Sequence, residues 1–163
     1  MNPRMRRLTA DSIAMRTEFA GHPNISVTPI GYEPPESYRI IYRLRGVSLD
    51  QKGQPLFIEE FQVLIQLGST YPREKPLAVM ESPIFHPNFG PRIGEEICIG
   101  DYWSPAQSLV DIVITIGELI QYQRYNTRSP LNAVAARWVA SNESVFPVGN
   151  VSLFQREPEI KLV

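Results

Sequence analysis

The residues best suited to covalent chemistry lie close together near the middle of this 163-residue chain. Cys98 is the only cysteine, and Asn88 precedes it by ten positions. A thiolate is a nucleophile, and an asparagine amide can donate a hydrogen bond to the oxyanion formed when a thiolate attacks a carbonyl. The pair therefore predicts an acyl-transfer site with Cys98 as its nucleophile. The alternative is that Cys98, flanked by Ile97 and Ile99, is a small buried hydrophobic residue.

A histidine two positions before Asn88 could take part in the same chemistry. His86 could act as a base for the thiol, so that Cys98, Asn88 and His86 would form the catalytic set. It could equally hold the loop through a hydrogen bond to the backbone. The sequence leaves both roles open.

The segment that carries these residues, 82–106, contains four prolines and three glycines, which leave no room for regular structure. Irregular segments of about 25 residues are uncommon in compact domains and are usually functional. This segment is therefore the predicted site, and the regular elements on either side must position it.

Before this loop, the sequence predicts one helix and an antiparallel sheet. Apolar residues at spacings of three or four predict a one-sided helix over residues 3–20, which Gly21 and Pro23 end. Period-two alternation and short turns then predict a four-stranded antiparallel meander. The strands are expected at residues 25–30, 38–45, 60–67 and 77–81.

After the loop, the sequence predicts two helices. Polar residues at helical spacing indicate a largely buried central helix over 109–123, and a last helix is expected over 130–140 with Ser129 as its N-cap. The prediction is an α+β fold with a core domain of residues 1–142, followed by a C-terminal tail, 143–163, that is loose or docked.

Composition excludes several classes of function. The net charge of −1 gives no general attraction for nucleic acid or an anionic membrane. One cysteine and two histidines exclude an internal disulfide and a multi-cysteine zinc site, and no cofactor or metal is expected. No apolar stretch approaches the roughly 20 residues of a membrane helix. The arginine-rich N-terminus is not a secretory signal, so a cytoplasmic location is expected.

Four motifs in a fixed order resemble the core of the ubiquitin-conjugating enzymes, over about residues 3–142. They are YPREKP at 71–76, IFHPN at 84–88, ICI at 97–99 and WSPA at 103–106. Members of that family have an N-terminal helix, a four-stranded meander, a His-Pro-Asn loop, the cysteine, a central helix and further helices. A second His-Pro-Asn triplet, at 22–24, is interpreted as the stop of the first helix.

The resemblance implies a transferase. Cys98 would accept the C-terminus of a ubiquitin-like modifier from an activating enzyme and pass it to a lysine of a target protein, with or without a ligase. Asn88 would stabilise the oxyanion or hold the loop. Arg4, Arg6 and Arg7 would dock on the activating enzyme, although a solvated helix face explains them equally well. The other hypotheses are a catalytically silent scaffold that binds modifier or ligase, and a cysteine hydrolase that uses Cys98 with His86.

Departures from the family pattern suggest a divergent member, of the kind encoded beside ubiquitin-like proteins in bacteria. The spacing from Asn88 to Cys98 is longer than usual, so the insert at 90–94 could displace the asparagine. The stretch from Cys98 to Trp103 is shorter. Ser129 stands where many members have an aspartate close to the incoming lysine, and the fourth helix is absent or degenerate.

Overall fold

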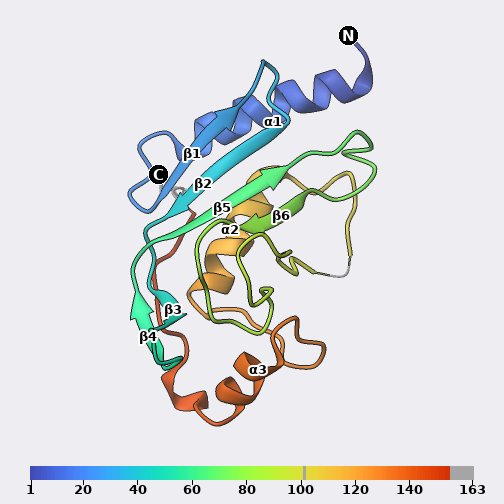
Figure 1. The fold of residues 1–163 in the computed structure, drawn as a ribbon. Helices are drawn as coiled ribbons and strands as arrows, with labels where there is room; N and C mark the ends of the chain where they lie inside the picture. The colour runs from blue at the N-terminus through green and yellow to red at the C-terminus, as the bar shows by residue number, and fades with distance from the viewer. Residues whose placement is uncertain (101, 155–163) are drawn as a thin grey trace, which may run out of the picture.

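The computed structural model describes residues 1–100 and 102–154. Its centre is a four-stranded antiparallel sheet with the strand order β1-β2-β5-β6. Helices α1 and α2 lie on the same side of this sheet (Figure 1), and their apolar faces meet the inner face of the sheet in one core. The predicted α+β fold and the predicted meander are confirmed.

Alternation decides which face of each strand is buried. In β2 (Ser37–Tyr42) and β5 (Phe61–Gln66), every second side chain points into the core. Strand β1 (Ile25–Ile30) pairs with β2, and β6 (Leu77–Met80) pairs with β5. Strand β2 ends at Tyr42 rather than at the predicted residue 45.

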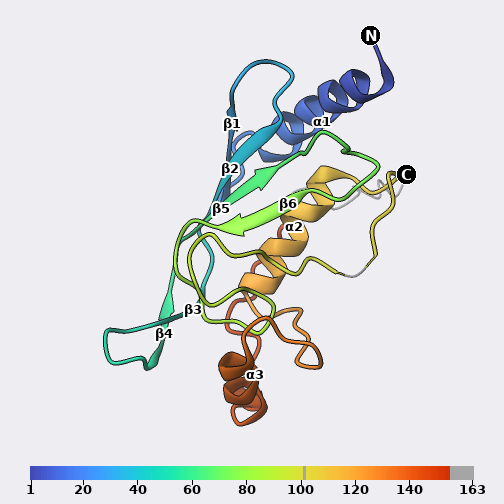
Figure 2. The ribbon, with the colours of Figure 1, turned by 45° about the vertical axis from the view of Figure 1, so that its right-hand side comes forward.

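A two-stranded hairpin that the sequence did not predict follows β2. It consists of β3 (Gly46–Leu49) and β4 (Pro55–Ile58), and it projects away from the larger sheet in Figure 2. The first residue of this hairpin is Gly46. A larger residue would clash at this position, because a Cβ there would lie 2.7 Å from the ring of Phe61. Each of the two strands has four residues, which is too few to show a period.

Helix α1 (Pro3–Phe19) agrees with the prediction to within one residue. The Asn2 side chain caps its first turn by accepting from the Met5 amide at 2.8 Å. Leu8, Ser12, Met15 and Phe19 are buried on one face, as the spacing predicted.

The expectation that the arginines of α1 lie on a solvated outer face is wrong for Arg7 and only partly right for Arg4. Arg7 forms an ion pair with Asp11 at 3.0 Å and also donates to Tyr71 and to the carbonyls of Pro105 and Gln107. Arg4 pairs with Glu36 at 3.0 Å. Sequence alone could not show this, because the partners of Arg7 include groups about 100 positions away. Arg6 is exposed.

The last two helices are shorter than predicted. Helix α2 (Leu109–Ile120) ends three residues early, and α3 (Ala133–Ala140) begins three residues late. The N-cap of α3 is Asn132, whose side chain accepts from the Ala135 amide at 3.0 Å, so the assignment of Ser129 as the N-cap is wrong. After α3, a single 3-10 turn (Glu143–Val145) precedes an extended segment within the described part of the chain.

This extended segment, residues 146–154, is docked along α2, and we call it the strap. The side chain of Gln121 bonds to both backbone groups of Val151, at 2.8 and 3.1 Å. Leu153 is buried against Gly117, where an added Cβ would lie 2.4 Å from the leucine. His22 holds the end of the strap in place through a hydrogen bond to the Leu153 carbonyl, at 2.9 Å. Residues 155–163 of the expected tail lie outside the described residues.

The second His-Pro-Asn triplet therefore does more than stop a helix. The His22 Nδ1 atom accepts from the amides of Asn24 and Ile25, at 3.0 and 3.1 Å. Its Nε2 atom thus carries the proton and donates to the strap. Gly21, with a φ of 70°, supplies the left-handed turn that ends the helix.

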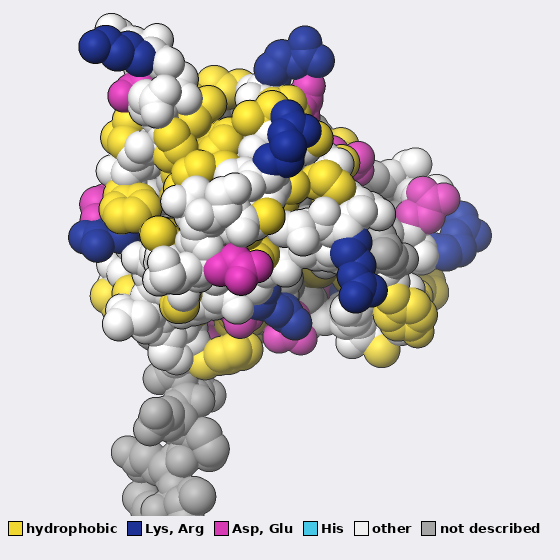
Figure 3. Space-filling view, turned by 90° about the horizontal axis from the view of Figure 1, so that it is seen from below, with side chains coloured by type: hydrophobic (Ala, Val, Ile, Leu, Met, Phe, Trp, Pro, Cys, Tyr) yellow, Lys and Arg dark blue, Asp and Glu magenta, His cyan; other side chains and the backbone are white. Residues whose placement is uncertain are grey.

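Among the described residues, no helix is long and apolar enough to cross a membrane. On the face shown in Figure 3, Lys and Arg side chains are separated by acidic and hydrophobic side chains and form no continuous basic patch.

Candidate active site

The insert at 90–94 forms a small hairpin that leaves Asn88 in place. A bridge pairs Phe89 with Ile97, and the Ile97 amide donates to the Ala78 carbonyl at 2.9 Å, which attaches the hairpin to the edge of β6. The Cys98 amide then donates to the Asn88 carbonyl at 2.9 Å. The longer spacing is thus absorbed in the tip of the hairpin, and the two residues remain neighbours.

The side chain of Asn88 is fixed by the segment that follows α2. Its amide nitrogen donates to the Asn126 carbonyl at 2.9 Å, and its amide oxygen accepts from the Asn126 amide at 2.9 Å. Asn88 is buried whereas Asn126 is exposed, so these bonds are partly shielded from competing water. The arrangement ties the cysteine loop to residues 123–129.

His86 is fully buried within an aromatic cluster. Its ring lies 4.2 Å from that of Tyr122 and 4.8 Å from that of Phe89, between ring centroids. Its Nδ1 atom accepts from the Asn88 amide at 3.0 Å, the same local bond that His22 makes. Burial lowers the pKa of His86 to about 3, although nearby backbone carbonyls favour the charged form. The ring is therefore neutral at physiological pH.

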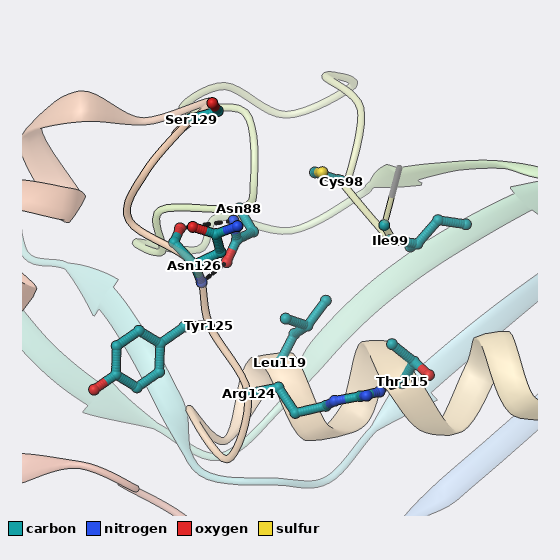
Figure 4. A pocket seen from close by; sticks show the side chains of 10 residues that line it. Asn88, Cys98, Ile99, Thr115, Leu119, Arg124, Tyr125, Asn126 and Ser129 are labelled. Atoms are coloured by element: carbon teal, nitrogen blue, oxygen red, sulfur yellow. Dashed lines mark hydrogen bonds between the residues drawn. The ribbon is translucent and has the colours of Figure 1, made fainter. Parts of the chain in front are cut away.

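Cys98 is partly exposed and opens onto a pocket of about 270 Å³. In Figure 4 its sulfur lies above the pocket, with Leu119 on the opposite side and Ser129 across the gap. His86 is not among the lining residues. The lining comprises Asn88, Cys98, Ile99, Gly100, Thr115, Leu119, Arg124, Tyr125, Asn126 and Ser129. Cys98 is thus not a sealed core residue.

The sequence analysis missed several of these lining residues. Arg124, Tyr125 and Asn126 lie in the run RYNTRS between two apolar helices, and Thr115 is a polar position of α2. The polar run itself could have indicated these residues, because it forms the loop between α2 and α3, and both helices pack beside the loop that carries Cys98. Ser129 was singled out, but its position across from Cys98 is not that of a helix cap.

The described residues of the site include no set of side chains suited to a metal. Across residues 1–100 and 102–154, no group of three or more His, Cys, Asp or Glu side chains could hold a metal ion. Arg124 contributes the one cation among the described lining residues. Its guanidinium lies 3.4 Å from the Thr115 hydroxyl and 4.0 Å from the Glu118 carboxylate.

Known proteins share this architecture. A family model described as "Ubiquitin-conjugating enzyme" matches residues 32–148. The chain is 31% identical over 107 residues to "Ubiquitin-conjugating enzyme E2 27" of Arabidopsis thaliana, a match that covers 64% of this chain and 54% of that protein. The chain thus spans about half the length of this curated relative.

A solved structure named "Novel Ubiquitin-Conjugating Enzyme" has the same fold, with a TM-score of 0.63 and 21% identity over 90% of this chain and 91% of that one. The resemblance found in the four motifs is therefore confirmed. The family match runs from the loop before β2, through the Asn88–Cys98 loop, to the residues after α3. The chain belongs to the ubiquitin-conjugating enzyme family.

Proposed function

We propose that the protein is an active conjugating enzyme that carries a ubiquitin-like modifier as a thioester on Cys98 and transfers it to a lysine. The observation that supports this most directly is the bond from the Cys98 amide to the Asn88 carbonyl, at 2.9 Å. It keeps a partly exposed thiol beside a fixed asparagine at the edge of a pocket that can receive two reactants.

The reaction consists of two acyl transfers. The Cys98 thiolate attacks the thioester held by the activating enzyme, so that one carbon–sulfur bond forms and the other breaks, and the released thiolate takes up a proton. A lysine amine then attacks the new thioester and loses a proton, while the Cys98 thiolate leaves. No oxidant or metal is required by this balance.

Asn88 can serve both roles that the sequence left open. Its amide nitrogen has two hydrogens, and one of them bonds to the Asn126 carbonyl. The second hydrogen can donate to the oxyanion of each tetrahedral intermediate. Because the loop-holding bonds orient the amide before the reaction, the first role supports the second.

We assign His86 to holding the loop. A ring that is fully buried, neutral and already accepting the Asn88 amide is poorly placed to take a proton from Cys98. The same geometry weighs against a cysteine hydrolase, which would need an imidazole within hydrogen-bond reach of the sulfur.

Ser129 is assigned to the acceptor side of the pocket. It lines the pocket across from Cys98, where its hydroxyl can accept a hydrogen bond from the incoming amine. A hydroxyl carries no charge, so it attracts a lysine less strongly than an aspartate would. Docking of the activating enzyme is assigned to Arg6 and to the partly exposed Arg4, since Arg7 is engaged within the fold.

The test is formation of the thioester. Incubation with ATP, an activating enzyme and its modifier should give an adduct that reducing agent cleaves. Cys98→Ala should give no adduct, and Cys98→Ser should give one that resists reducing agent, because thiols do not cleave an oxyester. An adduct that persists in Cys98→Ala would overturn the proposal. A folded wild-type protein that never forms an adduct would instead favour the silent scaffold.

A further inference from the structure

The wall of the pocket formed by α2 carries a charge that the proposed reaction does not itself require. Thr115 and Leu119 form this wall, and the Arg124 side chain folds back along it (Figure 4). Arg124 follows the end of α2, yet its guanidinium reaches the Thr115 hydroxyl at 3.4 Å. A cation thereby lies beside the part of the pocket that runs along α2 to Cys98, through which a reactant can approach the thiol.

This approach is the one that suits an extended peptide. Ile99 and Gly100 lie on one side of it and α2 on the other, so that several residues of a chain can lie between two elements. An extended chain rises about 3.3 Å per residue, and a chain that reaches Cys98 by this approach passes the α2 wall with the residues just before its reacting carboxyl.

Within the part of the chain that the structure describes, the cation is only weakly neutralised. The carboxylate paired with it there is that of Glu118, at 4.0 Å, and the Arg124 side chain is 57% exposed. Ion pairs of this kind contribute little, so the guanidinium can exchange Glu118 for a better placed carboxylate. No acidic side chain is among the described lining residues.

From these observations we propose that Arg124 selects modifiers whose C-terminal segment carries an acidic side chain shortly before the terminal glycine, and disfavours basic ones. The inference rests on the proposed function, because the segment reaches Arg124 only as it joins Cys98. It names the class of acyl group that this site accepts: an acidic peptide. Arg124 acts here as a specificity residue and takes no part in bond making.

Short peptide thioesters test this without an activating enzyme. The probes are the benzyl thioesters of acetyl-Glu-Ala-Glu-Gly-Gly, acetyl-Gln-Ala-Gln-Gly-Gly and acetyl-Arg-Ala-Arg-Gly-Gly. The Cys98 thiolate forms the new bond to the glycine carbonyl carbon, and phenylmethanethiolate leaves and takes up a proton. Mass spectrometry of the intact protein gives the rate of acylation, with Cys98→Ala as the blank.

The wild-type protein should react about two- to fivefold faster with the acidic peptide than with the basic one, the size expected for an exposed charge pair. Arg124→Glu should reverse the order. Arg128→Glu, in the same loop but outside the pocket lining, should keep it. Glu118→Gln should widen the preference, and about 0.5 M salt should reduce it.

The outcomes separate this inference from the proposed function. Equal rates for all three peptides, or an unchanged order in Arg124→Glu, would overturn the role of Arg124 while Cys98 remains an acyl acceptor. Failure of every peptide to acylate a wild-type protein that still forms the adduct with the activating enzyme would overturn the role of Arg124 alone, and failure in both assays would overturn both proposals. Reversal by Arg128→Glu as strong as that by Arg124→Glu would show a general effect of net charge and would also overturn the role of Arg124.

Discussion

The side chain of Asn88 pairs with the backbone of Asn126 through two hydrogen bonds, each of 2.9 Å. It thereby joins two segments that lie 38 positions apart, one carrying Cys98 and the other lining the far side of the pocket. A buried amide bonded in this way acts on the loop as well as on the reaction.

Asn88→Ala should therefore loosen the loop and slow the reaction together. The amide and carbonyl of the exposed Asn126 lose their partners on the buried Asn88 side chain, which costs about 0.5–1.5 kcal/mol per hydrogen bond. Hydrogen exchange of residues 123–129 should become faster, and discharge of the thioester to free lysine should become slower. Asn24→Ala, in the other His-Pro-Asn triplet, should change neither. Slower discharge with unchanged exchange would show that Asn88 acts on the oxyanion alone.

The His86 ring should make stability depend on pH. Its pKa of about 3 in the fold lies below the usual 6.5, so between these values the unfolded chain binds more protons than the folded one. Stability should therefore rise with pH across this window and fall as the solution is acidified, by at most about 1.4 kcal/mol per pH unit.

The measurement is urea unfolding at several pH values between 4 and 8, compared with His86→Gln. Glutamine keeps an acceptor for the Asn88 amide but does not titrate, so the variant should have a shallower slope below pH 6.5. Parallel curves for the two proteins would contradict a buried neutral His86.

Gly117 should be intolerant of a side chain because the strap packs on it. An added Cβ would lie 2.4 Å from Leu153 and 3.2 Å from Tyr42. Gly117→Ala should destabilise the protein by about 1–3 kcal/mol through overpacking. Combining it with Leu153→Ala should cost less than the sum of the two single changes, since the smaller residue relieves the clash. Strict additivity in urea unfolding would show that the strap is not seated on Gly117.

The two neighbouring arginines of α1 should behave differently. Arg7→Ala removes the partner of the buried Asp11 and of Tyr71 and should cost about 3 kcal/mol. Arg6→Ala, on the exposed side, should stay within about 0.5 kcal/mol of the wild type. Thermal unfolding of both variants measures this contrast. A similar small effect for both would mean that Arg7 is not part of the packed structure.

Much of the fold could be predicted because its signals are local. Alternation along β2 and β5 and the stripe of α1 depend on residues a few positions apart, and such signals give the correct order of the helices and of the four strands of the larger sheet. The chemistry of Cys98 and Asn88 was also visible as residue types within one loop. Short elements such as the β3–β4 hairpin escaped because four residues do not show a period.

By itself, then, the sequence determined the main architecture, the loop that carries the site, the cysteine proposed to react and the asparagine proposed to assist it. Only the tertiary structure decided that Arg7 forms an ion pair and hydrogen bonds within the fold, and that Arg124 and Ser129 line the same pocket as the cysteine. It also decided that the strap forms a hydrogen bond with His22. The reason is that such contacts join groups as far as 131 positions apart. Their partners are set by how whole elements pack against each other, which no local pattern of residues encodes.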